Sequence, residues 1–147
     1  MNALPLKLEV VAVPAIAPVD AKLDLVVRLT NPLDESVVVN RRLLLLPLGM
    51  PERFGELALD VGGPPGYQNV REIHVRTGPP RPEDFVKLAP GEAVERSVPL
   101  WRYESLHVPG QYTLSVTYHN TVPFALEGHT ALVGIATAQT MAERVAN

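Results

Sequence analysis

The stretch QYTLSVTYH, residues 111–119, decides the fold of this chain. From Tyr112 to Tyr118 every second residue is apolar or aromatic, and the residues between them are polar. Successive side chains of an extended chain point to opposite faces, so this period of two gives one face for a core and one for water. β-Branched and aromatic residues, which favour strands, carry the pattern. The stretch therefore predicts a β-strand.

Shorter segments with apolar residues at strand spacing lie on the N-terminal side of this stretch. They are residues 6–10, 23–29, 57–61, 72–76 and 94–100. Residues 36–46 contain the continuous apolar runs 37–39 and 43–46, which are typical of a strand buried on both sides or of one that crosses between sheets. Fifteen prolines and ten glycines separate these segments. Since proline interrupts a helix interior, long helices are not expected.

Turn signals between short strands predict an all-β fold, a two-sheet antiparallel sandwich of about 7–9 strands. The loops expected between the strands include the turn at 31–34, the Gly- and Pro-rich stretch 62–66 and an extended Pro-rich stretch 77–82. The length of 147 residues suits one domain, residues 1–147, with a core of its own. The C-terminal end is open to two interpretations. Residues 130–145 form a final strand, or residues 140–147 form a short helix, and we favour the strand because residues 111–119 need a partner.

One local motif resembles a known class of sandwich. The sequence Val108-Pro109-Gly110-Gln111-Tyr112-Thr113-Leu114 is similar to the tyrosine corner of immunoglobulin-like domains. The resemblance implies that the Tyr112 hydroxyl bonds back to the chain. It also implies that Leu114 stands where antibodies carry a cysteine, with Leu25 or Val27 as its apolar counterpart. Because Trp101 precedes the corner, the resemblance is to the broad immunoglobulin-like and fibronectin-like class rather than to antibody domains.

A second similarity covers about half of the chain. The segments 29–32, 88–92 and 109–112 follow a pattern found in many bacterial accessory modules. Examples are the sandwich domains beside secreted metalloendopeptidases and the small intracellular proteinase inhibitors of bacilli. These segments are mostly turns, so the resemblance implies a fold more directly than a function.

Composition argues against several functional classes. The formal net charge is −3, from 13 basic and 16 acidic residues spread along the chain, so neither nucleic-acid binding nor polybasic membrane attachment is expected. The absence of cysteine excludes disulfides, a thiol nucleophile and thiolate metal sites. Lys7 and Glu9 interrupt the first apolar run, so no signal peptide is expected and a cytoplasmic location is the default expectation.

Residues suited to catalysis or metal binding are few. His119, Glu127 and His129 are the one cluster with the side chains of a metal site, and they form the metal-binding or enzymatic alternative. No GxSxG or HExxH motif occurs. Ser105 and His107 are close only in sequence, without an orienting acid. We therefore expect no enzyme activity, no bound metal and no cofactor.

Two surface segments are candidates for binding a partner. Arg81, Glu83 and Phe85 lie in the Pro-rich loop 77–85, where stiffness would reduce the entropy lost on binding. Trp101-Arg102-Tyr103 forms the second candidate. The alternative roles are structural: Phe85 would fasten the loop to the sandwich, and Trp101 would belong to the core or its rim.

The expected function is that of a non-enzymatic binding or accessory module that recognises a protein partner through loops or a sheet edge. Exposed edge strands also leave self-association into a homo-oligomer open. A proteinase inhibitor that inserts the Pro-rich loop 77–85 into an enzyme cleft is the other alternative.

Overall fold

A computed structural model describes residues 2–46, 55–72, 78–103 and 106–147. These residues form β-strands joined by turns, with two short 3₁₀ helices, η2 (Pro82–Asp84) and η3 (Leu100–Arg102), and they contain no α-helix. The all-β prediction is confirmed. No helix in the described ranges has the length and apolar character needed to span a membrane.

The larger sheet has five strands around the stretch that the sequence singled out. Its order is β2 (Ile16–Pro18), β12 (Gly134–Val145), β9 (Gly110–Asn120), β5 (Leu57–Gly63) and β6 (Gly66–Val70). β9 lies at the centre, and Thr117 faces Thr137 of β12 on one side and Ala58 of β5 on the other. β12 confirms the strand interpretation of the C-terminal end.

The smaller main sheet has the order β1 (Lys7–Val13), β3 (Asp24–Thr30) and β8 (Ala93–Val98). Its alternation follows the sequence: Leu8, Val10 and Ala12 of β1 are buried, while the residues between them are exposed. Both neighbours of β3 are antiparallel to it, as expected.

Two ladders extend one end of the molecule. β4 (Val37–Asn40) pairs with β7 (Phe85–Leu88), and β10 (Ala125–Leu126) pairs with β11 (His129–Thr130). After β4 the chain passes on to a parallel bridge between Leu45 and Leu57 at the start of β5. The apolar run 36–46 therefore crosses from the β4–β7 pair to the five-stranded sheet.

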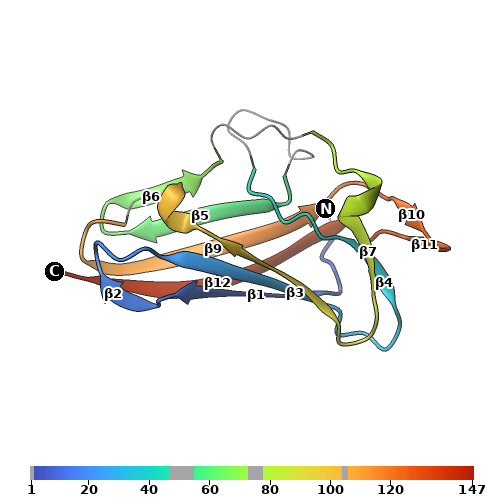
Figure 1. Cartoon of the computed structure of the whole chain (residues 1–147), viewed down its shortest axis with the longest axis horizontal. Helices are drawn as coiled ribbons and strands as arrows, with labels where there is room; N and C mark the ends of the chain where they lie inside the picture. Colours follow the sequence, from blue (N-terminus) through green and yellow to red (C-terminus); the bar gives the residue numbers. More distant parts are fainter. Residues whose placement is uncertain (1, 47–54, 73–77, 104–105) are drawn as a thin grey trace.

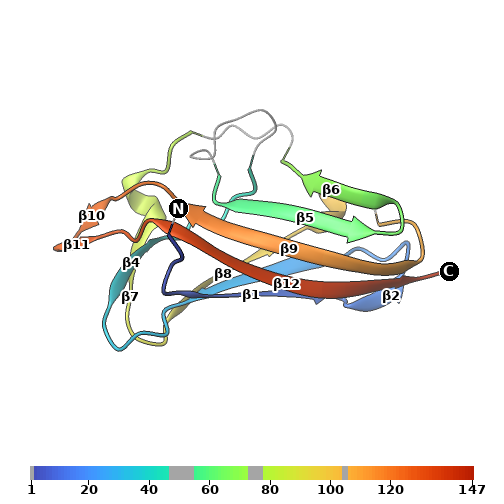
Figure 2. The same cartoon turned by 180° about the vertical axis from the view of Figure 1, so that it is seen from behind.

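The two larger sheets lie on one hydrophobic core (Figures 1 and 2). The smaller sheet contributes mainly from β1 and β3, and the larger sheet from β5 and β9. The main contributors are Leu8, Val10, Leu25, Val27, Leu29, Leu57, Leu59, Val61, Tyr112, Leu114, Val116 and Tyr118. A shared core between two sheets agrees with a β-sandwich kind of fold.

The bond expected for the tyrosine corner is present. The Tyr112 hydroxyl donates to the carbonyl of Val108 at 2.7 Å. Gly110 lies between them with φ of 140°, which L-residues rarely adopt, and this conformation turns the chain into β9. The corner therefore ties the segment before β9 to the strand itself.

Three details of the sequence-based prediction are wrong, and a fourth is untested. The described residues form twelve strands rather than 7–9, because two- and three-residue ladders such as β2 and β10 have no periodic signal. β2 runs parallel to β12, so the sheets are not wholly antiparallel. Residues 62–66 are not an open loop but the tip of the β5–β6 hairpin, in which Gly63 pairs with Gly66. The strand expected at 72–76 falls almost entirely outside the described residues.

Candidate functional site

A buried ion pair lies beneath the Pro-rich loop. Nη2 of Arg42 is 2.9 Å from Oε2 of Glu56, and the two side chains are 11% and 3% exposed. Nε of Arg42 donates to both carboxylate oxygens, at 3.0 and 3.1 Å. The backbone N–H of Leu44 donates to the same carboxylate at 3.2 Å. Because both charges meet several partners, the pair is satisfied although it is buried.

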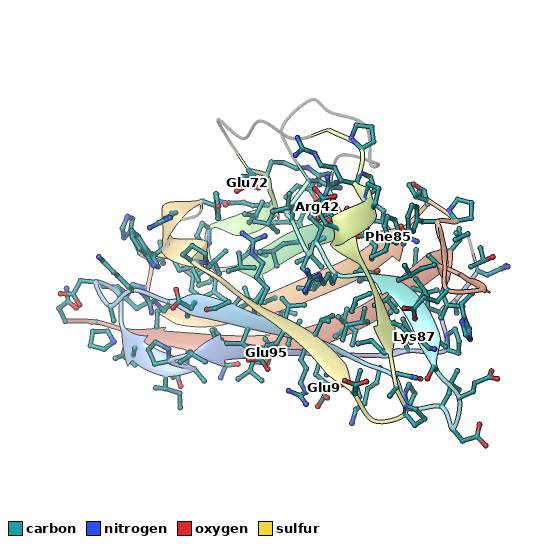
Figure 3. The ribbon with its side chains drawn as sticks, turned by 45° about the vertical axis from the view of Figure 1, so that its right-hand side comes forward. Glu9, Arg42, Glu72, Phe85, Lys87 and Glu95 are labelled. Carbon is teal, nitrogen blue, oxygen red and sulfur yellow. The ribbon has the colours of Figure 1, made fainter. Side chains whose placement is uncertain are left out.

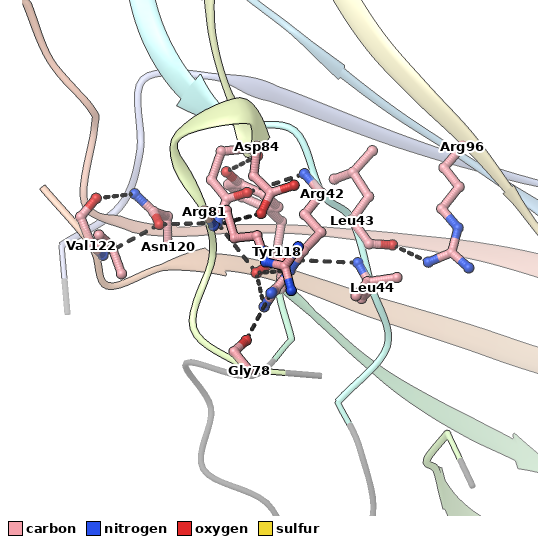
Figure 4. Close-up of polar contacts among 12 residues, drawn as sticks. Arg42, Leu43, Leu44, Gly78, Arg81, Asp84, Arg96, Tyr118, Asn120 and Val122 are labelled. Carbon is pink, nitrogen blue, oxygen red and sulfur yellow. Dashed lines mark hydrogen bonds and ion pairs between the residues drawn. The ribbon is translucent and has the colours of Figure 1, made fainter. Parts of the chain in front are cut away.

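Polar groups of three strands extend this pair into a network (Figure 4). The Asn40 side chain donates to Glu56 at 3.2 Å and to Asn120 at 3.4 Å. The Tyr118 hydroxyl donates to the Asn40 carbonyl at 2.7 Å. Burial is the main cause of the raised pKa of Tyr118, and the Glu56 carboxylate adds to it. The network joins β4, β5 and β9 where their ends meet.

Between Arg42 and Leu44 the backbone adopts an unusual conformation. Leu43 has φ of 52°, in the left-handed region that a leucine rarely occupies. Nη1 of Arg96 on β8 donates to the Leu43 carbonyl at 2.6 Å. Since both neighbours of Leu43 also bind Glu56, the surrounding contacts hold this strained residue in place.

Arg42 also holds the Pro-rich loop in place. Nη1 of Arg42 donates to the Gly78 carbonyl at 2.8 Å. Farther along, the Arg41 N–H donates to the Asp84 carbonyl at 2.7 Å. The loop also closes on itself, because the Arg81 N–H donates to Oδ2 of Asp84 at 2.7 Å and the Asp84 N–H donates to the Arg81 carbonyl at 2.9 Å. Residues 78–84 are therefore fixed at both ends.

The outer side of this loop carries two exposed charged side chains. The Arg81 and Glu83 side chains are exposed, and neither makes an ion pair or hydrogen bond with the described part of the chain. An open groove of about 470 Å³ lies beside them, lined by Arg42, Leu44, Gly78, Pro79, Arg81, Glu83 and Asp84. We refer to Arg81, Glu83 and this groove as the loop surface.

Phe85 does not belong to the loop surface. It is the first residue of β7 and is buried, and its ring stacks on Phe124 with the ring centroids 4.7 Å apart. Figure 3 labels it beside the short helix η2, which it directly follows. Contact between Phe85 and a partner would require this stack to open. Its position therefore supports the alternative role, in which Phe85 fastens the loop to the sandwich. The extended conformation expected for residues 77–82 is present at Arg81, and the chain turns directly after it in the 3₁₀ helix Pro82–Asp84.

The second candidate segment lies elsewhere, on η3. Trp101 is 40% exposed, the ammonium of Lys22 lies 4.3 Å from its ring centroid, and the Arg102 guanidinium lies 5.2 Å from it. Both contacts are cation–π arrangements, and the two cations give this surface local positive charge. Trp101 is therefore a surface residue rather than part of the core.

Tyr103, the third residue of that segment, points away from the Trp101 surface. It packs against the main core, and its hydroxyl donates to Oε1 of Glu72 at 2.7 Å. Burial raises the pKa of Tyr103, and the bond to Glu72 raises it further. We therefore assign it a structural contact.

The three residues of the metal-binding alternative do not assemble into a site. His119 is buried at the end of β9, whereas His129 lies on β11, where its Nδ1 is 3.2 Å from the Glu127 carbonyl. Among the described residues, which include these three, no group of three or more His, Cys, Asp or Glu side chains could hold a metal ion. Glu127 lies in the β10–β11 turn next to His129, whereas His119 lies on β9 before β10 begins.

Sequence reasoning did not find the Arg42–Glu56 pair. The two residues are 14 positions apart, and Arg42 stands within the stretch 36–46, between its two apolar runs. A charged residue within such a run is a signal of a buried partner, but the sequence does not identify that partner.

No protein-family model matches this chain, and no curated protein matches it either. The function therefore has to be inferred from the geometry of these surfaces.

Proposed function

We propose that this chain is a non-enzymatic binding module of immunoglobulin-like type that recognises a protein partner through the loop surface. The observation that carries the proposal is the fixation of the Pro-rich loop by Arg42, which binds Glu56 in the interior and Gly78 in the loop. A loop held in this way presents Arg81 and Glu83 in one arrangement.

The immunoglobulin-like assignment rests on two features. The first is the Tyr112 hydroxyl bond to Val108 before β9. The second is the core between the sheets, to which Leu114, Leu25 and Val27 all contribute as the resemblance implies. The parallel β2–β12 pair and the β10–β11 ladder are additions to the simple form of that fold.

Preorganisation is the physical reason for choosing the loop surface. Ordering a flexible loop at an interface opposes binding, so a loop that is already ordered retains more of the interaction free energy. Arginine is also enriched among residues that dominate interfaces, because its planar guanidinium forms several hydrogen bonds at once. Arg81 meets these conditions, since its backbone is bonded to Asp84 while its guanidinium faces solvent.

The proteinase-inhibitor alternative receives less support from this geometry. A segment that occupies a proteinase cleft in the manner of a substrate has to be extended. Here the loop turns at Pro82–Asp84, and the Asp84 N–H is bonded to the Arg81 carbonyl. An extended conformation would break both bonds between Arg81 and Asp84.

Site-specific crosslinking tests the proposal. A photo-reactive amino acid at Glu83 should crosslink one protein in native lysate, and excess unlabelled wild-type chain should abolish the product. The same probe at Glu95, an exposed residue on β8, should give no such product. Because interface arginines commonly contribute more than about 1 kcal/mol, Arg81→Ala should compete at least about fivefold less well than wild type.

Arg28→Ala is the matched control, since Arg28 is an exposed arginine on β3. It should compete as well as wild type. Equal competition by folded Arg81→Ala would show that the loop surface is not the binding site. A crosslink that excess wild-type chain does not reduce would contradict specific recognition.

A further inference from the structure

Arg144 is a buried cation near the end of the last strand. It is 4% exposed and lies in β12, paired with Gly110 of β9 and Ala17 of β2. Three of its five N–H donors meet backbone carbonyls. Nε donates to Leu106 at 3.4 Å, and Nη2 donates to Val19 at 3.2 Å and to Ala21. These bonds fix the plane of the guanidinium.

The remaining nitrogen has no partner among the described residues. Nη1 of Arg144 is buried and makes no hydrogen bond with that part of the chain. Arg144 also takes part in none of the ion pairs between described residues, which are Lys7–Glu9, Arg28–Glu95, Arg42–Glu56 and Lys87–Glu127. Arg42, the other well-buried arginine, has a carboxylate against it. A buried charge without a counter-ion is unfavourable, so the described residues leave the Arg144 environment incomplete.

A hollow of about 110 Å³ adjoins this guanidinium. Trp101, Leu100, Leu23 and Leu106 give it apolar walls, and Lys22 adds a second cation. Leu100 and Trp101 belong to η3, which lies toward the opposite end of the molecule from β10 and β11 (Figure 1). The hollow is therefore separate from the loop surface, and an inference about it does not rest on the proposed function.

We propose that this hollow binds a carboxylate, whose oxygens accept hydrogen bonds from Nη1 of Arg144. Carboxylates match the planar donors of a guanidinium, and the apolar walls suit a short aliphatic stem beside the anion. The volume admits a few non-hydrogen atoms, so the ligand is a small carboxylic acid or the carboxylate at the end of a peptide. Lys22 increases the local positive potential at the entrance.

Because Nη1 is buried, the carboxylate reaches it only after a side chain at the rim of the hollow moves. Trp101 and Lys22 are in contact with each other and belong to the exposed rim, together with Asp20 and His107. Binding should therefore disturb the indole. Trp101 is the single tryptophan of the chain, so its fluorescence reports on this hollow alone.

The first experiment titrates the intact protein with sodium propionate while Trp101 fluorescence is recorded. A saturable change with a dissociation constant on the order of millimolar is expected. Propionamide, which has the same shape without the charge, and sodium chloride at equal ionic strength should give no saturable change. In a parallel ¹⁵N NMR titration, the amides of Ala21, Lys22 and Trp101 should shift more than that of Arg81.

Arg144→Gln should weaken propionate binding about tenfold or more, because it removes the charge and the donor. Two exposed variants test the same site without risk to the core. Asp20 also lines the hollow and makes no ion pair in the described ranges, so Asp20→Asn should tighten binding about twofold. Lys22→Gln should weaken it by a similar factor.

Two further titrations define the ligand. The first uses N-acetyl-alanine, with its uncharged amide as the control. If N-acetyl-alanine binds more tightly than propionate, the carboxylate at the end of a peptide is identified as the source. Weaker binding would identify a small free acid, and either result supports the carboxylate site. Inorganic phosphate that binds more tightly than every carboxylate would overturn the ligand class.

Three other results would overturn the site itself. They are an equal response to propionamide, unchanged affinity in a folded Arg144→Gln protein, and shifted amides that avoid the hollow. If Arg144→Gln does not fold, the opposite effects of Asp20→Asn and Lys22→Gln still decide the question. No change of affinity in either variant would contradict the proposal.

Discussion

At the scale of single residues, Arg42 and Glu56 are the charged groups with the strongest structural role. Their carboxylate and guanidinium are 2.9 Å apart in a nearly water-free environment. Such pairs gain little over apolar residues of equal size, but removal of one member leaves the other charged and buried. The pair therefore acts as a constraint on where β4, β5 and the Pro-rich loop can lie.

Glu56→Gln should destabilise the protein by about 3 kcal/mol, because it leaves the Arg42 charge without a counter-ion. Glu95→Gln is the matched control, since Glu95 pairs with Arg28 at 3.3 Å with both side chains about half exposed. That change should cost less than about 1 kcal/mol. Urea unfolding followed by circular dichroism measures both, and equal effects would contradict a special role for the buried pair.

At the scale of an element, β5 shows how close packing restricts a strand. Gly63, its last residue, lies against the Tyr112 ring, and a Cβ there would be 2.3 Å from Cδ1 of that ring. Gly62, the preceding residue, has nothing within 4 Å of the corresponding position. The tyrosine corner and the β5–β6 hairpin therefore fit together only because Gly63 has no side chain.

Gly63→Ala should destabilise the protein by about 1–3 kcal/mol, because the methyl group displaces the buried Tyr112 ring. Gly62→Ala should be neutral or stabilising by up to about 1 kcal/mol, since it reduces the freedom of the unfolded chain without a clash. Thermal unfolding of the two variants measures the difference. A Gly63→Ala protein as stable as Gly62→Ala would show that the hairpin and the corner do not pack closely.

At the scale of the whole molecule, Tyr118 links the sheets. Its ring belongs to the main core, and its hydroxyl bonds to Asn40 of the β4–β7 pair. Burial raises its pKa above the ordinary value of 10.0. The folded protein therefore keeps the phenol proton to a higher pH than the unfolded chain does. The resulting stabilisation is complete below about pH 10 and is lost as the pH rises above that value.

The free energy of unfolding should fall above pH 10 by up to about 1.4 kcal/mol per pH unit for each such tyrosine. Tyr118→Phe should be about 1 kcal/mol less stable than wild type at pH 8, because the Asn40 carbonyl loses its donor. This difference in the free energy of unfolding should become smaller as the pH rises from 10 to 11. Denaturant unfolding across this range measures it, and a constant gap would show that Tyr118 ionises normally in the folded state.

Local periodicity accounts for the part of the structure that could be predicted. β1, β3 and β9 alternate with a period of two, and their buried faces are those expected. The tyrosine corner is also local, since Tyr112 and Val108 are four residues apart. By contrast, the short strands β2, β10 and β11 have two or three residues each, which is too few to show a period.

The sequence by itself therefore determined the all-β class, the main strands with their buried faces, and the corner before β9. Only the tertiary structure decided which distant side chains and backbone groups meet. Arg42 meets Glu56, and Phe85 meets Phe124. Arg144 meets the carbonyls of Val19 and Ala21 more than one hundred residues away, while its Nη1 finds no partner in the described ranges. Such contacts depend on how distant strands align, and hydrophobic alternation specifies which face is buried but not which polar groups meet at the strand ends.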